Sequence, residues 1–434
     1  MLNLLTQLVN KSLVIVDEQE SLTRYRLLET IRQYARDKLL EADESEKMRH
    51  WHLDFFLKFV EEAEPHFNSP SEMEWISRLE ADADNLRVAL EWATGNDVEI
   101  ALRLGIALHL FWSRHGYEEE GRRMLREALA RLKALPQVDG EAARQRIALQ
   151  AKALNALGIL GFGLGDFRGS VKVFEESVGL ARQIGEKRTL SWALSYIGIG
   201  RAFLGDTGIS YPAAEEGLTL AREVGDKVLL GLALINMAGT VAMAHGDPKT
   251  AQLYGEEGLQ LLKEAGSHWA YAMTLYGMGL SAADQGNYTE SRSRLETCLT
   301  LFAELRDRHR VNMIHSELAH LERREGHYVQ AKPLYRETLL EWQRLGHRAA
   351  IAHQLECFAF IAKAQEEDQR ATMLFGAAEV LRENINIPMN PPERAEYERE
   401  VSDLRINMDK SAFAKAWAEG RVWSMEQAVA FALE

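Results

Sequence analysis

The sequence predicts an all-α fold, a solenoid of antiparallel helical hairpins with a period of about 40 residues, and three small-residue series predict it. Five turn triplets begin 40 or 41 residues apart, at Gly165, Gly205, Gly246, Gly286 and Gly326. A second series keeps this period, at Gly185, Gly225, Gly266 and Gly346, with Arg306 in the missing place. A third lies seven residues before each turn, at Gly158, Gly198, Gly239, Gly279 and Ala319. The stretches between these positions read as helices, so each unit is expected to contain two of them.

Each series has its own expected role. A turn glycine can adopt a positive φ and end the first helix. A glycine in mid-helix costs about 0.5–1 kcal/mol relative to alanine, so its repetition predicts close contact between the two helices of a hairpin. Large residues such as Phe174 and Leu295 follow on the second helix, although Ala214 and Gly255 stand at two of these positions. This pattern resembles the tetratricopeptide repeat, lengthened from its usual period of about 34 residues.

Residues 1–40 differ from the repeats. Leucines at helical spacing come first, and a β-type run follows at residues 13–16. Residues 17–21 form a polar turn, after which residues 25–28 can return as a second strand, and residues 30–40 read as a helix. A helix, a β-hairpin and a helix in this order resemble the back half of a winged helix.

Particular stretches carry a more specific resemblance. The run Asn10-Lys11-Ser12-Leu13-Val14 and the segment 24–35 are similar to the winged-helix end of bacterial signal-transducing ATPases with numerous domains (STAND ATPases). That family includes LuxR-like, maltose-activator-type transcriptional regulators. Residues 374–379, 392–394 and 412–421 resemble the closing segment of such ATPases. The resemblance implies a nucleotide-binding domain, a winged helix and then helical repeats that sense a signal.

Four regions are therefore expected: a partial winged helix at 1–40, a helical bridge at 41–100, repeats at 101–365, and a degenerate repeat with a C-terminal helical cap at 366–434. In the bridge, one helix is expected around residues 51–59 and a second over 75–92, with Ser71 as the N-cap of the second. An early repeat is expected to turn at Gly116.

Composition narrows the function classes. The chain has 434 residues, and its formal charge of −14 argues against non-specific binding to nucleic acid or to an anionic membrane. The two cysteines, Cys298 and Cys357, lie far apart in helical segments, which predicts buried thiols and no disulfide framework. Such cysteine usage is typical of a reducing cytosol, so a cytoplasmic location is expected.

No membrane segment is expected either. Residues 1–9 are interrupted by polar residues and have no basic region before them, so they do not read as a secretory signal. The most apolar later stretch, residues 231–244, contains Asn236 and is shorter than the about 20 residues that a spanning helix needs.

The sequence contains no positive sign of catalysis. A Gly-x-x-x-x-Gly-Lys-Ser/Thr phosphate loop is absent, so the chain is not expected to bind or hydrolyse ATP by itself. His315, Glu317 and His320 lie close together, but His315 and His320 are five residues apart and diverge by about 140° on a helix. We therefore expect no metal site there, no cofactor and no enzyme activity.

In tetratricopeptide repeats the first helix of each hairpin lines the concave surface, and this resemblance predicts a ligand row. One helical phase selects polar residues at a period of 40 or 41: Asn155, Ser195, Asn236, Tyr276, Ser316 and Glu356. Neighbouring positions add Trp192, Ile199, Leu280, His320 and Phe360. Polar and apolar side chains in alternation suit an extended peptide or a small polar ligand, whereas ordinary solvated helix positions are the simpler interpretation.

Two hypotheses for function follow. The first is a non-enzymatic sensor or scaffold that binds a protein segment, peptide or small ligand in its concave groove, with the partial winged helix facing an upstream nucleotide-binding domain. The alternative is a transcriptional regulator that binds DNA through residues 1–40. That segment carries six Lys/Arg and five Asp/Glu, which is weakly basic for a DNA-reading module, so nucleic acid is the less expected partner.

Overall fold

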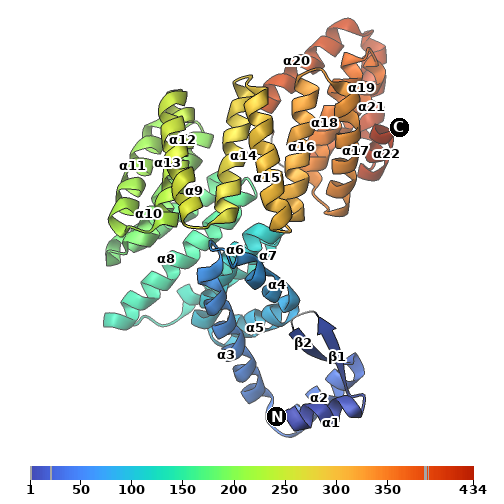
Figure 1. Cartoon of the computed structure of the whole chain (residues 1–434). Coiled ribbons are helices and arrows are strands. Elements are labelled where there is room, and N and C mark those ends of the chain that lie inside the picture. The colour runs from blue at the N-terminus through green and yellow to red at the C-terminus, as the bar shows by residue number, and fades with distance from the viewer. Residues whose placement is uncertain (1, 20–21, 386–388, 390) are drawn as a thin grey trace.

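The computed structural model describes residues 2–19, 22–385, 389 and 391–434. The described residues form 22 α-helices, one short 3₁₀ helix and a single two-stranded sheet (Figure 1). The helices follow one another as antiparallel hairpins stacked side by side. The predicted all-α repeat solenoid is confirmed.

The N-terminal segment contains the expected helix, hairpin and helix. Its elements are α1 (Leu2–Asn10), β1 (Val14–Gln19), β2 (Leu22–Leu27) and α2 (Glu29–Glu41). The strands are antiparallel, with Val14 opposite Leu27. The expected polar turn includes residues 20 and 21, which lie outside the described residues. An ion pair of 2.6 Å between Arg24 and Asp82 joins the hairpin to the bridge.

The bridge is more broken than the sequence predicts. Its elements are α3 (Ser45–Ala63), the 3₁₀ helix η1 (Glu64–His66), α4 (Glu72–Ala81) and α5 (Ala83–Asn96). The single helix expected over residues 75–92 is wrong, because the chain leaves the helical conformation at Asp82, where φ is −111° and ψ is 14°. Ser71 does stand at the expected N-cap position, directly before α4. Its hydroxyl is hydrogen-bonded to His66 Nδ1 at 2.7 Å and does not cap α4.

Seven helical hairpins follow the bridge. Their helices are α6 (Val98–His115) and α7 (Glu118–Ala134), α8 (Gly140–Gly163) and α9 (Phe167–Ile184), α10 (Lys187–Phe203) and α11 (Thr207–Val224), α12 (Lys227–His245) and α13 (Pro248–Glu264), α14 (His268–Asp284) and α15 (Tyr288–Glu304), α16 (Arg308–Arg324) and α17 (Tyr328–Arg344), and α18 (Arg348–Ala364) and α19 (Asp368–Ile385). The helices α20 (Pro391–Asn407), α21 (Lys410–Arg421) and α22 (Met425–Leu433) close the C-terminal end.

Left-handed residues end helices at the predicted positions. Gly165, Gly205 and Gly326 have φ of 78°, 78° and 80°, as their turns require. Arg306 and Glu366 adopt φ of 51° and 63° where the repeat has lost its glycine. The turn therefore keeps its left-handed conformation even where another residue replaces the preferred glycine.

The mid-helix glycines lie at close contacts. A Cβ on Gly158 would lie 2.6 Å from the Phe174 ring, and one on Gly198 would lie 2.6 Å from Ala214 Cβ. Both contacts are with the second helix of the same hairpin, as predicted. Gly239 differs, since its nearest neighbour is Ile199 of the preceding first helix, at 2.6 Å.

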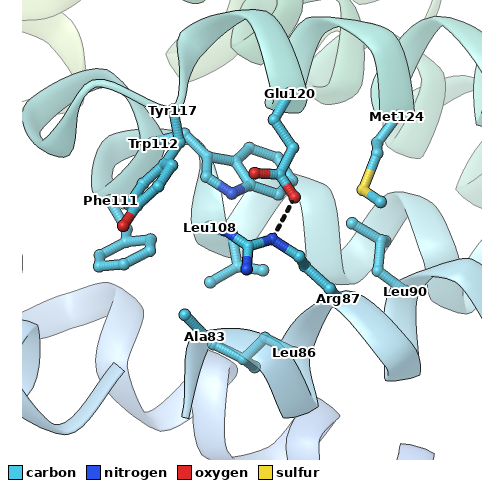
Figure 2. Close-up of a pocket in the computed structure, with 10 residues that line it drawn as sticks. All are labelled: Ala83, Leu86, Arg87, Leu90, Leu108, Phe111, Trp112, Tyr117, Glu120 and Met124. Carbon is cyan, nitrogen blue, oxygen red and sulfur yellow. Dashed lines mark hydrogen bonds and ion pairs between the residues drawn. The ribbon is translucent and has the colours of Figure 1, made fainter. Parts of the chain in front are cut away.

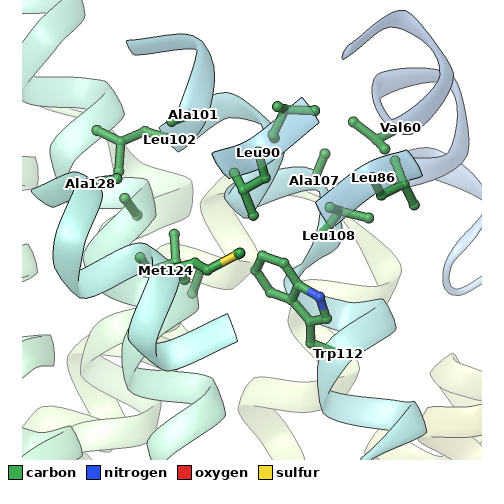
Figure 3. Close-up of a cluster of buried hydrophobic side chains, with 14 of the residues drawn as sticks. Val60, Leu86, Leu90, Ala101, Leu102, Ala107, Leu108, Trp112, Met124 and Ala128 are labelled. Carbon is green, nitrogen blue, oxygen red and sulfur yellow. The ribbon is translucent and has the colours of Figure 1, made fainter. Parts of the chain in front are cut away.

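The core consists of successive hydrophobic clusters along the stack, and the N-terminal one joins the bridge to the first hairpin. Figure 3 shows its central part, where Trp112 of α6 and Met124 of α7 point toward each other and the leucines of α5 lie nearby. Leu79, Leu102 and Leu104 in this cluster are fully buried. The bridge is therefore a part of the folded stack.

Helix α12 corrects one expectation. Residues 231–244 alone are too short to span a membrane, but the longer stretch 227–244 is long and apolar enough by length and composition. In the structure α12 packs against α10, α11 and α13 as a repeat helix. Leu234 and Met237 are buried there.

Segments almost 200 residues apart in the sequence meet beside α14. The Ser267 hydroxyl donates to Asn68 Oδ1 at 3.2 Å, and the Arg114 guanidinium lies 4.6 Å from the centre of the Trp269 ring. Arg310 donates to the backbone oxygen of Ser113 at 3.5 Å. The stack thus curves back until the fifth hairpin contacts the bridge and the first hairpin (Figure 1). We call these contacts, which join the loop before α4 and the end of α6 to the start of α14 and to α16, the α4–α14 junction.

Candidate functional site on the first helices

The predicted row divides into a buried and a half-buried part. Asn155 is buried, and its side-chain amide donates to Thr189 O at 2.9 Å. Ser195 is buried against α11, where a Cβ on Gly217 would lie 2.7 Å from its hydroxyl. Ile199 is buried against Gly239. These three side chains fill contacts between helices.

The middle of the row is the open part. Trp192, Asn236, Tyr276 and Leu280 are each half-buried. Trp192 stacks on Tyr196 with ring centres 5.9 Å apart. Within the part of the chain that the structure describes, the Asn236 amide has no hydrogen-bond partner.

The C-terminal part of the row is buried in a polar network. Ser316 Oγ accepts hydrogen bonds from Trp342 Nε1 at 3.0 Å and from Gln354 Nε2 at 2.8 Å. Glu356 is 1% exposed and is held by Arg382 through bonds of 2.5 and 2.8 Å. The polar groups of these side chains are therefore hydrogen-bonded to other residues of the same chain.

The other two C-terminal members of the row are buried as well. His320 Nδ1 lies 2.6 Å from the Tyr335 hydroxyl. The guanidinium of Arg323 lies over the ring of the buried Phe360, 4.7 Å from the centre of that ring. All four C-terminal positions of the row are therefore covered.

Helix α20 contributes to this burial. Glu396 forms a bidentate ion pair with Arg323 at 2.7 and 3.0 Å, and Lys363 bonds Glu400 and Asp403 at 2.5 and 3.0 Å. The row is therefore accessible in its middle and closed by the cap at its C-terminal end. No local sequence signal indicates this, because α20 is separated from α16 by more than 60 residues.

Sequence reasoning did not select two residues that lie beside the open part. Glu317 accepts a hydrogen bond of 3.1 Å from the Tyr276 hydroxyl, and Tyr196 contacts Phe162 as well as Trp192. Both stand one residue after a member of the row and repeat with the same period, so the neighbouring helical phase would have found them.

Burial governs the titration of these groups. It raises the pKa of Tyr196 to about 12. It also raises the pKa of Tyr276 well above its usual value, with a further contribution from the charge of Glu317. The pKa of Glu317 is raised by burial too. Both tyrosines are therefore neutral hydrogen-bonding groups near neutral pH.

The contact of α20 is expected to weaken in acid. Burial opposes ionisation of Glu396 most strongly, but its hydrogen bonds with Arg323 and the charges of the nearby arginines together outweigh burial and lower its pKa. A lowered pKa contributes stability that is complete above the usual value of about 4.3 and is lost as pH falls through the lower folded value. Glu396→Gln should be less stable than the wild type by about 1 kcal/mol near pH 6, with the difference shrinking toward about pH 3. Urea unfolding at each pH measures this. A difference that stays constant with pH would contradict it.

One small cavity lies outside the row. It has a volume of about 20 Å³ and lies between α5, α6 and α7, where Arg87 and Glu120 are joined at 2.7 Å (Figure 2). That space is about the size of a water molecule. A second, open hollow of about 510 Å³ lies at the helix ends around Gln145, Lys187 and Arg188, and many of the side chains that line it are charged. Neither cavity is a candidate for an enclosed ligand site.

Comparison with known proteins agrees with the repeat fold. The family model described as "Anaphase-promoting complex subunit 5" matches residues 139–199, 198–240 and 254–325, which is less than half of the chain. Proteins of Mycobacterium bovis and Mycobacterium tuberculosis, each named "Putative HTH-type transcriptional regulator", are 31% identical over 204 residues. That match covers 45% of this chain, and it spans only 22% of each relative's length.

Two solved structures are similar to the chain. One is a STAND protein with a tetratricopeptide repeat sensor from Pyrococcus horikoshii, with a TM-score of 0.53, 14% identity, and coverage of 97% of this chain and 58% of the other. The second is a Rap protein complexed with Competence and Sporulation Factor, with a TM-score of 0.50, 14% identity, and coverage of 85% and 99%. At this identity the likeness shows the fold alone. The chain thus has the helical-repeat fold of tetratricopeptide sensor proteins, as its sequence pattern predicts.

Proposed function

We propose that this chain is the non-enzymatic sensor part of a STAND-type regulator and that it binds a peptide or protein segment along the middle of its first-helix row. The observation that carries this proposal is the open part of the row. Asn236 and Tyr276 hold equivalent places on the first helices α12 and α14, and Trp192 of α10 lies three residues before the equivalent position, Ser195. They remain half-buried while the ends of the row are covered.

The chemistry of the open part suits an extended peptide. The free amide of Asn236 can donate to a backbone carbonyl and accept from a backbone N–H, and the rings of Trp192 and Tyr276 offer apolar area beside it. Glu317 can accept from a further donor once Tyr276 turns toward a ligand. An apolar surface with a few placed polar groups is typical of such sites. A Rap protein of similar fold was solved in complex with Competence and Sporulation Factor, which supports a ligand-binding role for this fold.

The exposed surface of the N-terminal segment supports the proposal that an upstream domain is a partner. Apolar side chains on the hairpin and on α2 are exposed, with Tyr34 at 61% and Leu40 at 67%. Helix α2 has no buried residue among those described. A surface of this kind marks a contact with another domain. We propose that a nucleotide-binding domain covers it, as the resemblance to STAND ATPases implies.

The α4–α14 junction offers a route between the two surfaces. It joins the bridge, which adjoins the N-terminal segment, to α14, which carries Tyr276. It consists mainly of hydrogen bonds and a cation–π contact, each contributing about 1 kcal/mol. A peptide that changes the curvature of the stack can therefore open or close the junction at small cost.

A defined peptide library tests the proposal. Fluorescein-labelled random peptides of about ten residues, a length that suits an extended strand, are screened by anisotropy, and the best binder is then measured. Asn236→Ala with Tyr276→Ala should weaken it at least tenfold, about 1.4 kcal/mol, because both contacts are lost. Leu253→Ala on the outer face of α13, where the side chain is 68% exposed, is the matched control and should bind as the wild type does. Equal affinity in the double variant, with its helical circular dichroism intact, would reject this site.

A further inference from the structure

A cluster of three side chains that can bind a metal lies between α16 and α18, apart from the open part of the row. His353 and Cys357 are four residues apart on α18, so they share one face of the helix. His320 approaches them from α16, the first helix of the preceding hairpin. Cys357 is fully buried, His320 is 8% exposed, and the His353 side chain is 24% exposed.

The spacing of the ligand atoms matches a tetrahedral centre. Cys357 Sγ lies 3.5 Å from His320 Nδ1 and 3.8 Å from His353 Nε2. A tetrahedral zinc ion with Zn–S of about 2.3 Å and Zn–N of about 2.0 Å separates sulfur from nitrogen by about 3.6 Å. The two imidazole rings meet at 70°, with centres 4.9 Å apart, so their nitrogens converge from different directions.

A carboxylate orients one of the imidazoles from behind. His353 Nδ1 lies 3.4 Å from Glu356 Oε2, and Arg382 holds the same carboxylate by two bonds. With the proton on Nδ1, the lone pair of Nε2 faces Cys357. Carboxylate–histidine pairs of this kind are the usual support of a metal-ligating imidazole. Glu356, selected from sequence as a groove residue, thus has a supporting place in this cluster.

We propose that His320, His353 and Cys357 form a zinc site that joins α16 to α18. The thiol loses its proton to solvent when the ion binds, and Nδ1 of His320 and Nε2 of His353 supply the nitrogen ligands. The Tyr335 hydroxyl, which is hydrogen-bonded to His320 Nδ1 at 2.6 Å, has to turn aside so that this nitrogen can bind the ion. The ion ties together two consecutive hairpins at the capped end of the stack, so the stability of that end depends on zinc.

The ligand types favour zinc over harder ions. One thiolate and two imidazoles are soft and borderline ligands, which suit zinc and not magnesium or calcium. A second cluster, formed by Glu322, Glu325 and His327, provides an instructive contrast. It lies at the surface, and Arg292 already pairs with both of its carboxylates at 2.7 and 2.8 Å. It carries no proposal.

Cobalt provides the spectroscopic test, since Co²⁺ takes the place of zinc in tetrahedral thiolate sites. The full chain, freed of metal by a chelator, is titrated with CoCl₂ and then with ZnSO₄. We expect one Co²⁺ per chain, intense visible bands typical of tetrahedral cobalt, and a near-ultraviolet thiolate-to-cobalt band, all removed by zinc. Cys357→Ser should abolish the thiolate band, and His353→Gln should weaken binding at least tenfold. Cys298→Ser, a buried thiol bonded to Ala272 O, and His327→Ala are the controls and should behave as the wild type does.

Thermal unfolding gives an independent readout. Zinc at 100 times its dissociation constant should stabilise the Cys298→Ser protein by about 2.7 kcal/mol and leave Cys357→Ser unchanged. If Cys357→Ser does not fold, the thiolate band in Cys298→Ser still identifies the ligand, because Cys357 is then the sole cysteine. Weak octahedral cobalt spectra in the wild type, or loss of the thiolate band in Cys298→Ser, would overturn the proposal. Loss of zinc binding in His327→Ala alone would also overturn it by placing the ion at the surface cluster. Peptide binding is not needed for any of these readouts, so they are independent of the proposed function.

Discussion

Replacing Gly420 by alanine is expected to separate α21 from α19 and to lower the free energy of unfolding by about 3 kcal/mol, the upper part of the usual range for overpacking. The added Cβ would collide with the backbone oxygen of Met373. The opposite helix makes a second tight contact, since a Cβ on Gly376 would lie 2.5 Å from the Trp417 oxygen. In both cases the obstacle is backbone, which cannot move aside as the end of a side chain can. The two helices can therefore approach only through glycine.

Other helical glycines provide the matched controls. Gly179 in α9 and Gly277 in α14 have no atom within 4 Å of an added Cβ. Alanine there should leave stability unchanged or raise it by up to about 1 kcal/mol, because alanine has the higher helix propensity. Chemical denaturation followed by circular dichroism compares the three variants. Equal stability of Gly420→Ala and Gly179→Ala would show that the cap does not depend on this crossing.

The second large effect is expected at the buried ion pair of Glu72 and Arg114. Their side chains are 1% and 3% exposed, and Arg114 also donates to Asn68 Oδ1 at 2.7 Å. Glu72→Gln leaves the buried guanidinium without its counter-charge, so we expect a loss of about 3–5 kcal/mol. Because Arg114 also lies over Trp269, the α4–α14 junction should loosen as well.

Two controls, a double variant of this pair and a variant of an exposed ion pair, separate the effect of the buried charge from the effect of packing. Glu72→Met with Arg114→Met removes both charges at similar volume and should recover most of the stability. Glu61→Gln removes one partner of the half-exposed pair with Arg103 and should cost less than about 1 kcal/mol. Denaturant midpoints, together with hydrogen exchange at residues 266–269, measure both effects. A loss in Glu72→Gln no larger than that in Glu61→Gln would contradict the importance of the buried pair.

Local chemistry explains why the repeat could be predicted. A residue with positive φ is needed at each turn, glycine provides it best, and a regular series of glycines therefore reveals the hairpins. Arg306 and Glu366 show how the fold tolerates exceptions once its neighbours are in place. The break at Asp82 escaped prediction because the apolar pattern of α4 continues into α5.

The candidate sites depended more strongly on distant parts of the chain. Period alone places Asn155, Asn236 and Glu356 at one helical phase, but it does not show which of them meets solvent. Glu356 is buried because Arg382 and the cap lie over it, and Asn155 because α10 begins beside it. The same packing brings His320 within 3.5 Å of Cys357, although 37 residues separate them.

The sequence by itself determined the architecture, since turn glycines, helix propensity and a 40-residue period act within one or two neighbouring units. It also indicated the helix and β-hairpin at the N-terminus, which are built from contacts between nearby residues. Only the tertiary structure decided which part of the row is open, where α20 covers it and which thiol and imidazoles converge. Those outcomes depend on the curvature of the whole stack and on side chains that meet across many helices, and no local pattern records them.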